Sequence, residues 1–254
     1  MVSLPWTVAC LREPVPRCAA RLPAHACSVL IDVFPYRFEN DGDRAMARFA
    51  CVEDYHAVVG AALRERAGEL SKKYPDNVFV PFVDNSPLDE VYCAAAAGLG
   101  VVGEHGLLIT PEFGSWVFIG AIVTDREMGE NEAREETDGN GVVSAAHASA
   151  AALPRCERCG ACKAACPVGL DKTRCLSAVT QKKGALTEAE AAALRRYRLL
   201  WGCDICQDAC PHQGRSAPAP GFAYCPRPTA DVTGKVYAWR EAALRRNMAI
   251  LENP

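Results

Sequence analysis

Four cysteines within eleven residues are the side chains of this sequence most clearly arranged for chemistry. They occur as Cys156-x2-Cys159-x2-Cys162-x3-Cys166 and are followed directly by Pro167. This is the spacing of bacterial ferredoxins, in which three cysteines bind one 4Fe–4S cluster and the fourth binds a second cluster. Backbone N–H groups of such a loop point toward the cluster and offset its negative charge. The motif therefore predicts electron transfer through iron–sulfur clusters.

A second, shorter motif follows later in the chain. It reads Cys203-x2-Cys206-x3-Cys210-Pro211 and lacks one cysteine. In two-cluster ferredoxins the last cysteine of each motif crosses to the other cluster, so the second cluster here needs a further ligand. Cys175, between the motifs, is assigned to it by elimination. The predicted ligands are Cys156, Cys159, Cys162 and Cys210 for cluster 1, and Cys166, Cys175, Cys203 and Cys206 for cluster 2.

Zinc and disulfide bonds are the alternatives for a chain with 14 cysteines. Paired Cys-x2-Cys elements do bind zinc, but two Cys-Pro-terminated motifs fit that metal poorly. The sequence shows no signal peptide and no run of the ~18 apolar residues of a membrane span. We therefore expect a cytoplasmic protein with reduced thiols and no membrane partner. Six cysteines are assigned no chemistry: Cys10, Cys18, Cys27, Cys51, Cys93 and Cys225.

Composition and charge do not indicate a dedicated nucleic-acid-binding protein. Half of the 254 residues are hydrophobic, which is enough for a packed core, and the formal net charge is −3. Basic residues outnumber acidic ones only locally, between positions 154 and 201. They either offset anionic clusters on a solvated helix face or meet an anionic partner, such as RNA or an acidic electron donor.

Strands and helices precede the cysteine motifs. One helix is predicted from Asp54 onward, with apolar residues on one face. A second is predicted with Ser86 as N-cap, Pro87 at its first position and its end at Gly98. Apolar, β-branched runs predict strands at 28–36, 77–83, 107–110 and 115–125. This alternation predicts an α/β domain with a central sheet.

Changes in composition divide the chain into three expected parts. The first ends in an acidic, then small and polar linker at 126–151. In the second, Thr187 and Glu190 form the capping-box pattern of a helix that connects the two cysteine motifs. The expected parts are an α/β domain at 1–150, a double-cluster module at 152–225 and a C-terminal helix at 226–254.

Several segments, in the same order, resemble the epoxyqueuosine reductase family. They lie between Ser28 and Pro211 and read FPYRFENDGDRAMARFACVEDYHAVV, VDNSPLDEVYCAAAAGLGVVGEHGLLITPEFGSWVFIGAIVTD, CERCGACKAACP, DKTRCLS and GCDICQDACP. The resemblance implies an α/β (α+β), nitroreductase-like, cobalamin-binding domain followed by a ferredoxin-like module. It also implies that electrons pass from two 4Fe–4S clusters to cobalamin, which reduces the epoxide of epoxyqueuosine in tRNA to queuosine.

The resemblance also implies roles for residues of the α/β domain. Asp84, in the V-D-x-x-P segment, is the implied catalytic acid that protonates the departing oxygen. Tyr55 and His56, in the D-Y-H block, and His105, in a glycine-bounded turn, are implied cofactor-pocket residues. Without the resemblance, Asp84 is interpreted as an Asx turn before Ser86. An external donor such as ferredoxin or flavodoxin is expected to reduce the clusters.

The chain also departs from the family pattern. Residues 103–106 read G-E-H-G where the family has G-K-H/N-T, so Glu104 replaces a cation. The spacing from Pro167 to Cys175 is compressed, and the region before Ser28 is short. We also expect the C-terminal helical-repeat domain that assists tRNA binding to be absent. Two alternatives therefore stay open: a reductase of another substrate on the same scaffold, and a non-catalytic two-cluster electron-transfer protein.

Overall fold

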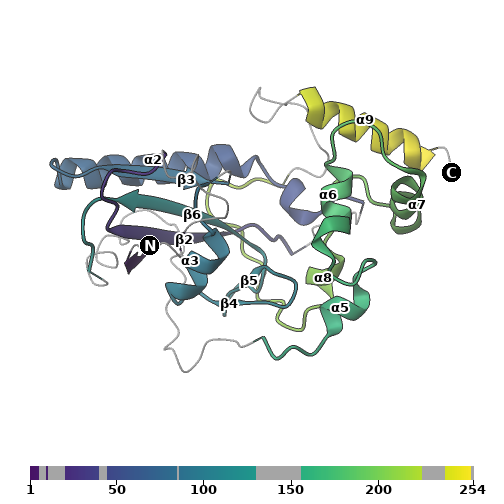
Figure 1. Ribbon diagram of the computed structural model, residues 1–254, viewed down its shortest axis with the longest axis horizontal. Coiled ribbons are helices and arrows are strands. Elements are labelled where there is room, and N and C mark those ends of the chain that lie inside the picture. Colours follow the sequence, from purple (N-terminus) through teal and green to yellow (C-terminus); the bar gives the residue numbers. More distant parts are fainter. Residues whose placement is uncertain are drawn as a thin grey trace.

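The fold has two parts that lie next to each other along the long axis of the molecule, a sheet with flanking helices and a group of short helices (Figure 1). In the computed structural model the described residues are 1–5, 10, 21–39, 45–84, 86–129, 156–224 and 238–252. The expected linker at 126–151 lies outside this set except for its first four residues, and Cys18 and Cys225 lie outside it too. Mixed α/β architecture, as predicted, is confirmed.

A four-stranded antiparallel sheet forms the centre of the first part. Its order is β1-β2-β6-β3, with β2 and β6 paired along their whole length. Alternate residues of β2 enter two cores, Leu30 and Phe34 on one face and Val29 and Ile31 on the other. The strands are β1 (Val2–Pro5), β2 (Ser28–Pro35), β3 (Phe79–Val83) and β6 (Val117–Thr124). Three of the predicted strands are thereby confirmed.

Helix α2 (Tyr55–Lys73) covers one face of the sheet, as Figure 1 shows. Its buried residues include Val59, Leu63 and Leu70, whose spacing places them on one side of the helix. Asp54 is the N-cap, and its side chain accepts a hydrogen bond from the backbone N–H of His56. The helix predicted from Asp54 onward is confirmed.

Helix α3 (Glu90–Ala96) packs near the other face and starts later than predicted. Its N-cap is Asp89, whose carboxylate accepts from the backbone N–H of Tyr92. The prediction of Ser86 as N-cap was therefore wrong. Ser86 Oγ instead accepts from the N–H of Leu88, which leaves these residues in a turn that buries the Leu88 side chain. The predicted end of the helix near Gly98 is confirmed, because the backbone adopts a left-handed conformation at that residue.

A small hairpin, β4 (Val101–Val102) with β5 (Leu108–Ile109), follows α3. The predicted strand at 107–110 is thus confirmed in shortened form. Gly100 permits the close packing at its base, since a Cβ there would lie 2.3 Å from the carbonyl oxygen of Ile109. The hairpin projects from the sheet part toward the second part of the molecule (Figure 1).

Short helices carry the cysteine motifs. The capping box of Thr187 and Glu190 is present, and α9 confirms the predicted C-terminal helix over Ala238–Glu252, whereas the rest of 226–254 lies outside the described residues. Buried Asn247 of α9 donates to the carbonyl groups of Thr180 and Leu200, so α9 closes this part of the fold. The helices are α5 (Ala161–Ala165), α6 (Leu176–Thr180), α7 (Glu188–Tyr197), α8 (Ile205–Asp208) and α9 (Ala238–Glu252). Of the helices in the described ranges, none is long and apolar enough to cross a membrane.

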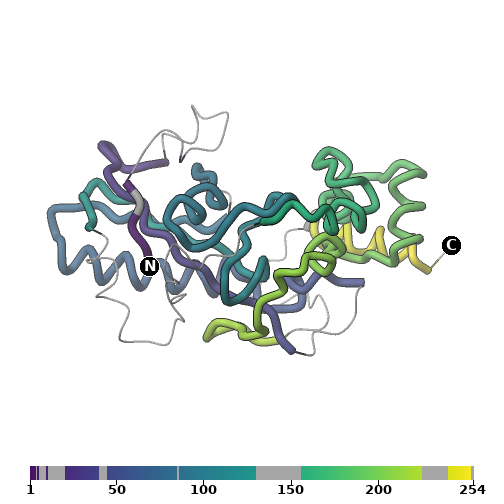
Figure 2. Tube along the Cα trace, turned by 90° about the horizontal axis from the view of Figure 1, so that it is seen from below, coloured from purple at the N-terminus to yellow at the C-terminus, as the bar shows by residue number. Residues whose placement is uncertain are grey.

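The two parts are joined by polar contacts. The backbone N–H of Arg48 donates to Asp204 at 2.7 Å, and its guanidinium binds Asp208 at 2.7 Å and lies over the ring of Trp116. Beyond α8, the chain returns along the sheet part (Figure 2), where the N–H of Ala219 donates to a β2 carbonyl. These contacts fix the cysteine-bearing helices relative to the sheet.

Candidate functional site

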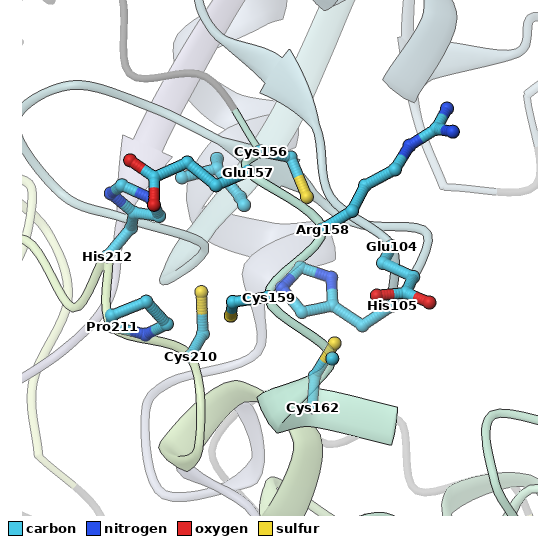
Figure 3. A pocket seen from close by; sticks show the side chains of 12 residues that line it. Glu104, His105, Cys156, Glu157, Arg158, Cys159, Cys162, Cys210, Pro211 and His212 are labelled. Atoms are coloured by element: carbon cyan, nitrogen blue, oxygen red, sulfur yellow. The ribbon is translucent and has the colours of Figure 1, made fainter. Parts of the chain in front are cut away.

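Four of the predicted ligands line one small pocket (Figure 3). They are Cys156, Cys159, Cys162 and Cys210, the set predicted for cluster 1. Cys156 and Cys159 lie in the loop that enters α5 through the left-handed residue Gly160, Cys162 lies within α5, and Cys210 follows α8. The fold therefore brings the last cysteine of the second motif next to the first three cysteines of the first motif.

The other four predicted ligands also lie together. Cys166 ends α5, Cys175 is the N-cap of α6, and Cys203 and Cys206 lie at the start of α8 and within it. Burial raises the pKa of the Cys203 thiol to about 11 and that of Cys206 to about 12, and the charges of Cys166 and Cys175 add to both shifts. Cys175, assigned by elimination, is thus close to the three cysteines that it was assigned to join.

The thiol groups are suited to a multinuclear metal group. The eight predicted ligand cysteines are free thiols. Within the described residues no three His, Cys, Asp or Glu side chains converge on the position of a single metal ion. Four cysteines spaced around a pocket fit a cubane, in which each cysteine binds a different corner.

A larger cavity of about 450 Å³ lies between the sheet and the second group of cysteines. Cys175, Cys203 and Cys206 form one side of it. Aromatic residues form another side, where the rings of Tyr55 and Phe118 stack with centroids 4.3 Å apart. A group bound by these cysteines therefore adjoins a cavity large enough for a ligand of moderate size.

Asp84 and two predicted pocket residues meet at this cavity. Asp84 Oδ2 accepts a hydrogen bond from the Tyr55 hydroxyl at 2.8 Å and lies 3.2 Å from His56 Nε2. Asp84 has φ of 46°, a left-handed conformation that is uncommon outside glycine and is often found at functional sites. The structure thus brings together three residues from the end of β3 and the start of α2.

The pKa values of the two α2 residues show where protons reside. Hydrogen bonds to Asp54, at 2.7 Å, and to Asp84 raise the pKa of His56 to about 9. At neutral pH His56 is therefore an imidazolium that donates to both carboxylates. Burial and the charge of Asp84 raise the pKa of Tyr55 above its ordinary value, so its hydroxyl stays protonated. This group can hold and deliver a proton at the cavity.

His105 lies apart from that group but lines the same cavity. It also lines the small pocket of the first four cysteines. Burial lowers the pKa of its imidazole, so His105 is neutral at pH 7. The four pocket and catalytic residues implied by the resemblance are therefore divided: Tyr55 and Asp84 line one wall with His56 bound behind them, and His105 lies between the cavity and the first group of cysteines.

Sequence reasoning missed the role of Asp54 and of the aromatic wall. Asp54 was recognised only as the start of a helix, although its carboxylate also binds the His56 ring. The spacing Asp-x-His at a helix start was the available signal, because the N-cap side chain reaches the residue two positions later. Phe118 lies on β6 and Tyr36 directly follows β2; their ring centroids are 4.4 Å apart, a contact that could not be predicted from the sequence.

Some of the basic residues around the cysteine motifs have acidic partners. Lys182 binds Glu190 at 2.9 Å, and Arg195 pairs with Glu188 on the same helix, α7. Such pairs on an exposed helix face offset local charge and add little to stability. For these two residues the structure therefore favours the solvated-face interpretation over a free surface for an anionic partner.

Comparisons with known proteins show which enzymes the sequence resembles. No protein-family model matches the chain. An epoxyqueuosine reductase of Gloeobacter violaceus is 32% identical over 182 residues, 69% of this chain and 51% of that protein. One from a Synechococcus species is 36% identical over 186 residues, 70% of this chain and 52% of that protein. The chain thus spans about half the length of the curated relatives it matches.

Solved structures show the same fold. The epoxyqueuosine reductase of Streptococcus thermophilus matches with a TM-score of 0.70 at 22% identity, covering 89% of this chain and 64% of that chain. An epoxyqueuosine reductase in complex with an epoxyqueuosine-modified tRNA-Tyr stem loop matches with a TM-score of 0.68 at 22% identity, covering 96% of this chain and 70% of that chain. The resemblance seen in the motifs is therefore confirmed.

Proposed function

We propose that this chain, which resembles the epoxyqueuosine reductases in sequence and in fold, is an iron–sulfur reductase of the same reaction class. Its proposed substrate is the epoxide of epoxyqueuosine in tRNA. One observation carries the proposal: Cys175, Cys203 and Cys206 line the same cavity as Asp84 and Tyr55. The proposed ligands of an electron-carrying cluster and a group that can donate a proton therefore line the same cavity, as a reductase requires.

The two groups of cysteines are proposed to hold two 4Fe–4S clusters. The donor set fits, because each group supplies four thiols, and bound iron would offset the burial that raises the pKa of Cys203 and Cys206. Bound there, the clusters supply electrons one at a time. Because such clusters need reduced thiols, we propose a cytoplasmic protein and an external donor such as ferredoxin or flavodoxin.

The cavity is proposed to hold cobalamin. Its volume of about 450 Å³ and its walls of Phe49, Val117, Phe118 and Ile119 suit the edge of a large, flat cofactor. Tyr55 and His105, which line the cavity, are polar side chains that could fix its orientation. When bound, cobalamin supplies a reduced metal centre that can transfer two electrons to carbon.

The chain itself supplies the proton. Reduction of an epoxide to an alkene consumes two electrons and two protons and releases the oxygen as water. His56, protonated at neutral pH, donates to Asp84, and Tyr55 donates to the same carboxylate oxygen. Asp84, with half of its side chain exposed at the cavity, then passes a proton to the departing oxygen.

Complementation tests the tRNA substrate. The chain is expressed in a bacterial strain that lacks its own epoxyqueuosine reductase, and tRNA nucleosides are analysed. The proposal expects queuosine to reappear, and Asp84→Asn to abolish it at unchanged protein and iron levels. Persistent epoxyqueuosine with both clusters and corrinoid bound would indicate a reductase of another substrate.

Retention of the cofactor separates an enzyme from an electron carrier. The protein is purified anaerobically with cobalamin present and passed over a sizing column. We expect corrinoid absorbance to elute with the protein beside the iron–sulfur absorbance. Elution of the two clusters without any corrinoid would instead favour the non-catalytic carrier.

A further inference from the structure

The tip of the β4–β5 hairpin carries two charged or polar side chains into the pocket of the first cysteine group. Glu104 and His105 both line this pocket with Cys156, Cys159, Cys162 and Cys210 (Figure 3). The tip is a tight turn, in which the N–H of Gly103 donates to the carbonyl of Leu107 at 2.9 Å. Gly106 supplies the left-handed residue with φ of 82°.

The turn is built to seat the His105 ring. A Cβ at position 103 would lie 2.6 Å from Cε1 of His105 and 2.9 Å from its Nδ1. Only glycine at that position lets the imidazole fold back over the turn. The ring is therefore held in a defined place and points into the space between the cysteines (Figure 3).

Hydrogen bonding fixes the position of the imidazole proton. The backbone N–H of Leu107 donates to His105 Nδ1 at 3.2 Å, so Nδ1 is an acceptor. In a neutral imidazole the proton then resides on Nε2. Nε2 is buried and has no hydrogen-bond partner among the described residues. A buried donor without an acceptor is unfavourable, which indicates that a group bound in the pocket accepts this bond.

We propose that His105 donates its Nε2–H to a sulfur atom of the cluster held by the first cysteine group. This inference rests on the clusters of the proposed function. His105 acts as a positioning residue that sets the properties of cluster 1. Reduction adds negative charge to the cluster, so a donor to sulfur stabilises the reduced form and raises the reduction potential.

Glu104 acts on the same cluster with the opposite sign. Glu104 lines the same pocket as Cys162 and the other three cysteines of the first group. A negative charge there disfavours added electrons and lowers the reduction potential. The hairpin tip therefore holds one group that raises the potential and one that lowers it.

Redox titration followed by EPR tests the proposal on the anaerobic holoprotein. In His105→Leu, with full iron content, the potential of one cluster should fall while that of the other stays unchanged. His105→Gln, which keeps an N–H donor at about the same reach, should recover most of that shift, and Glu104→Gln should raise the same potential. An unchanged pair of potentials in His105→Leu at full iron content contradicts the proposal.

A second measurement needs no change at the hairpin. Protein labelled with ¹⁵N-histidine is reduced and examined by pulsed EPR, with His212→Gln as the matched variant because His212 also lines the pocket. Coupling of a histidine nitrogen to a cluster should persist in this variant, and absence of coupling refutes the hydrogen bond. If the wild-type protein does not hold two clusters, the proposed function is refuted together with this inference. If the potentials do not shift in His105→Leu at full iron content, only the role of His105 is refuted.

Discussion

The charge of His56 can be altered without disturbing the helix that carries it. Asp54→Asn removes the negative charge beside the imidazole, while asparagine remains a good N-cap for α2. The bond to Asp54 is the largest cause of the raised pKa of His56, ahead of the bond to Asp84. We therefore expect the pKa of His56 to fall by about 1–2 in this variant.

The same pKa gives the size of the effect on stability. A rise from 6.5 to about 9 corresponds to about 3.4 kcal/mol in favour of the protonated form. Because 41% of the His56 side chain is exposed, screening by solvent reduces this to about 1–2 kcal/mol. The bonds of protonated His56 to the two carboxylates stabilise the fold fully below pH 6.5, and this contribution is lost as the pH rises through about 9. In Asp54→Asn most of that pH dependence should disappear.

Titration of the histidine ring signals by NMR measures this directly. The chain has five histidines, and His56→Gln identifies the resonance of interest. Glu65→Gln is the matched control, because it removes an exposed carboxylate from the same helix and should leave the pKa of His56 unchanged. A wild-type pKa near 6.5, or the same value in wild type and Asp54→Asn, would refute the assignment of the proton to His56.

Four further substitutions probe the proposal and the fold. Asp84→Asn should keep full iron content and lower turnover by about 10²-fold or more, measured in single-turnover assays. Turnover equal to that of the wild type would mean that Asp84 only forms the turn and is not the catalytic acid. Cys175→Ser should remove about half of the iron, measured by metal analysis, whereas full iron content would leave the second cluster with a different ligand. Asp89→Ala should destabilise the protein by about 0.5–2 kcal/mol in urea unfolding, and no change would contradict the cap of α3. Gly100→Ala should cost about 1–3 kcal/mol in the same experiment, since the added Cβ meets a carbonyl oxygen; wild-type stability would contradict that contact.

Sequence spacing was sufficient for features that depend on neighbouring residues. The two cysteine motifs, with Cys175 added by elimination, predicted which residues meet, and the structure brings together the same two groups of four. The capping box of Thr187 and Glu190 was also visible, because a cap involves residues two or three positions apart. Their ligand and catalytic roles remain predictions.

Features that depend on tertiary contacts could not be predicted. Ser86 and Asp89 are both good N-caps, and the burial of Leu88 between them decides that α3 begins after Asp89. The strand order depends on the pairing of β2 with β6, and the aromatic wall depends on the stacking of Tyr55 on Phe118; both join segments far apart in the sequence. The buried Nε2 of His105 is equally invisible in sequence, because it depends on how the hairpin tip meets the cysteine loop.

The central claim is that two groups of four cysteines each hold a 4Fe–4S cluster beside a reducing site. Iron and acid-labile sulfide, quantified with zinc in protein purified without oxygen, measure this directly. We expect about eight irons and eight sulfides per chain and negligible zinc. Four irons or fewer, or stoichiometric zinc, would contradict the account.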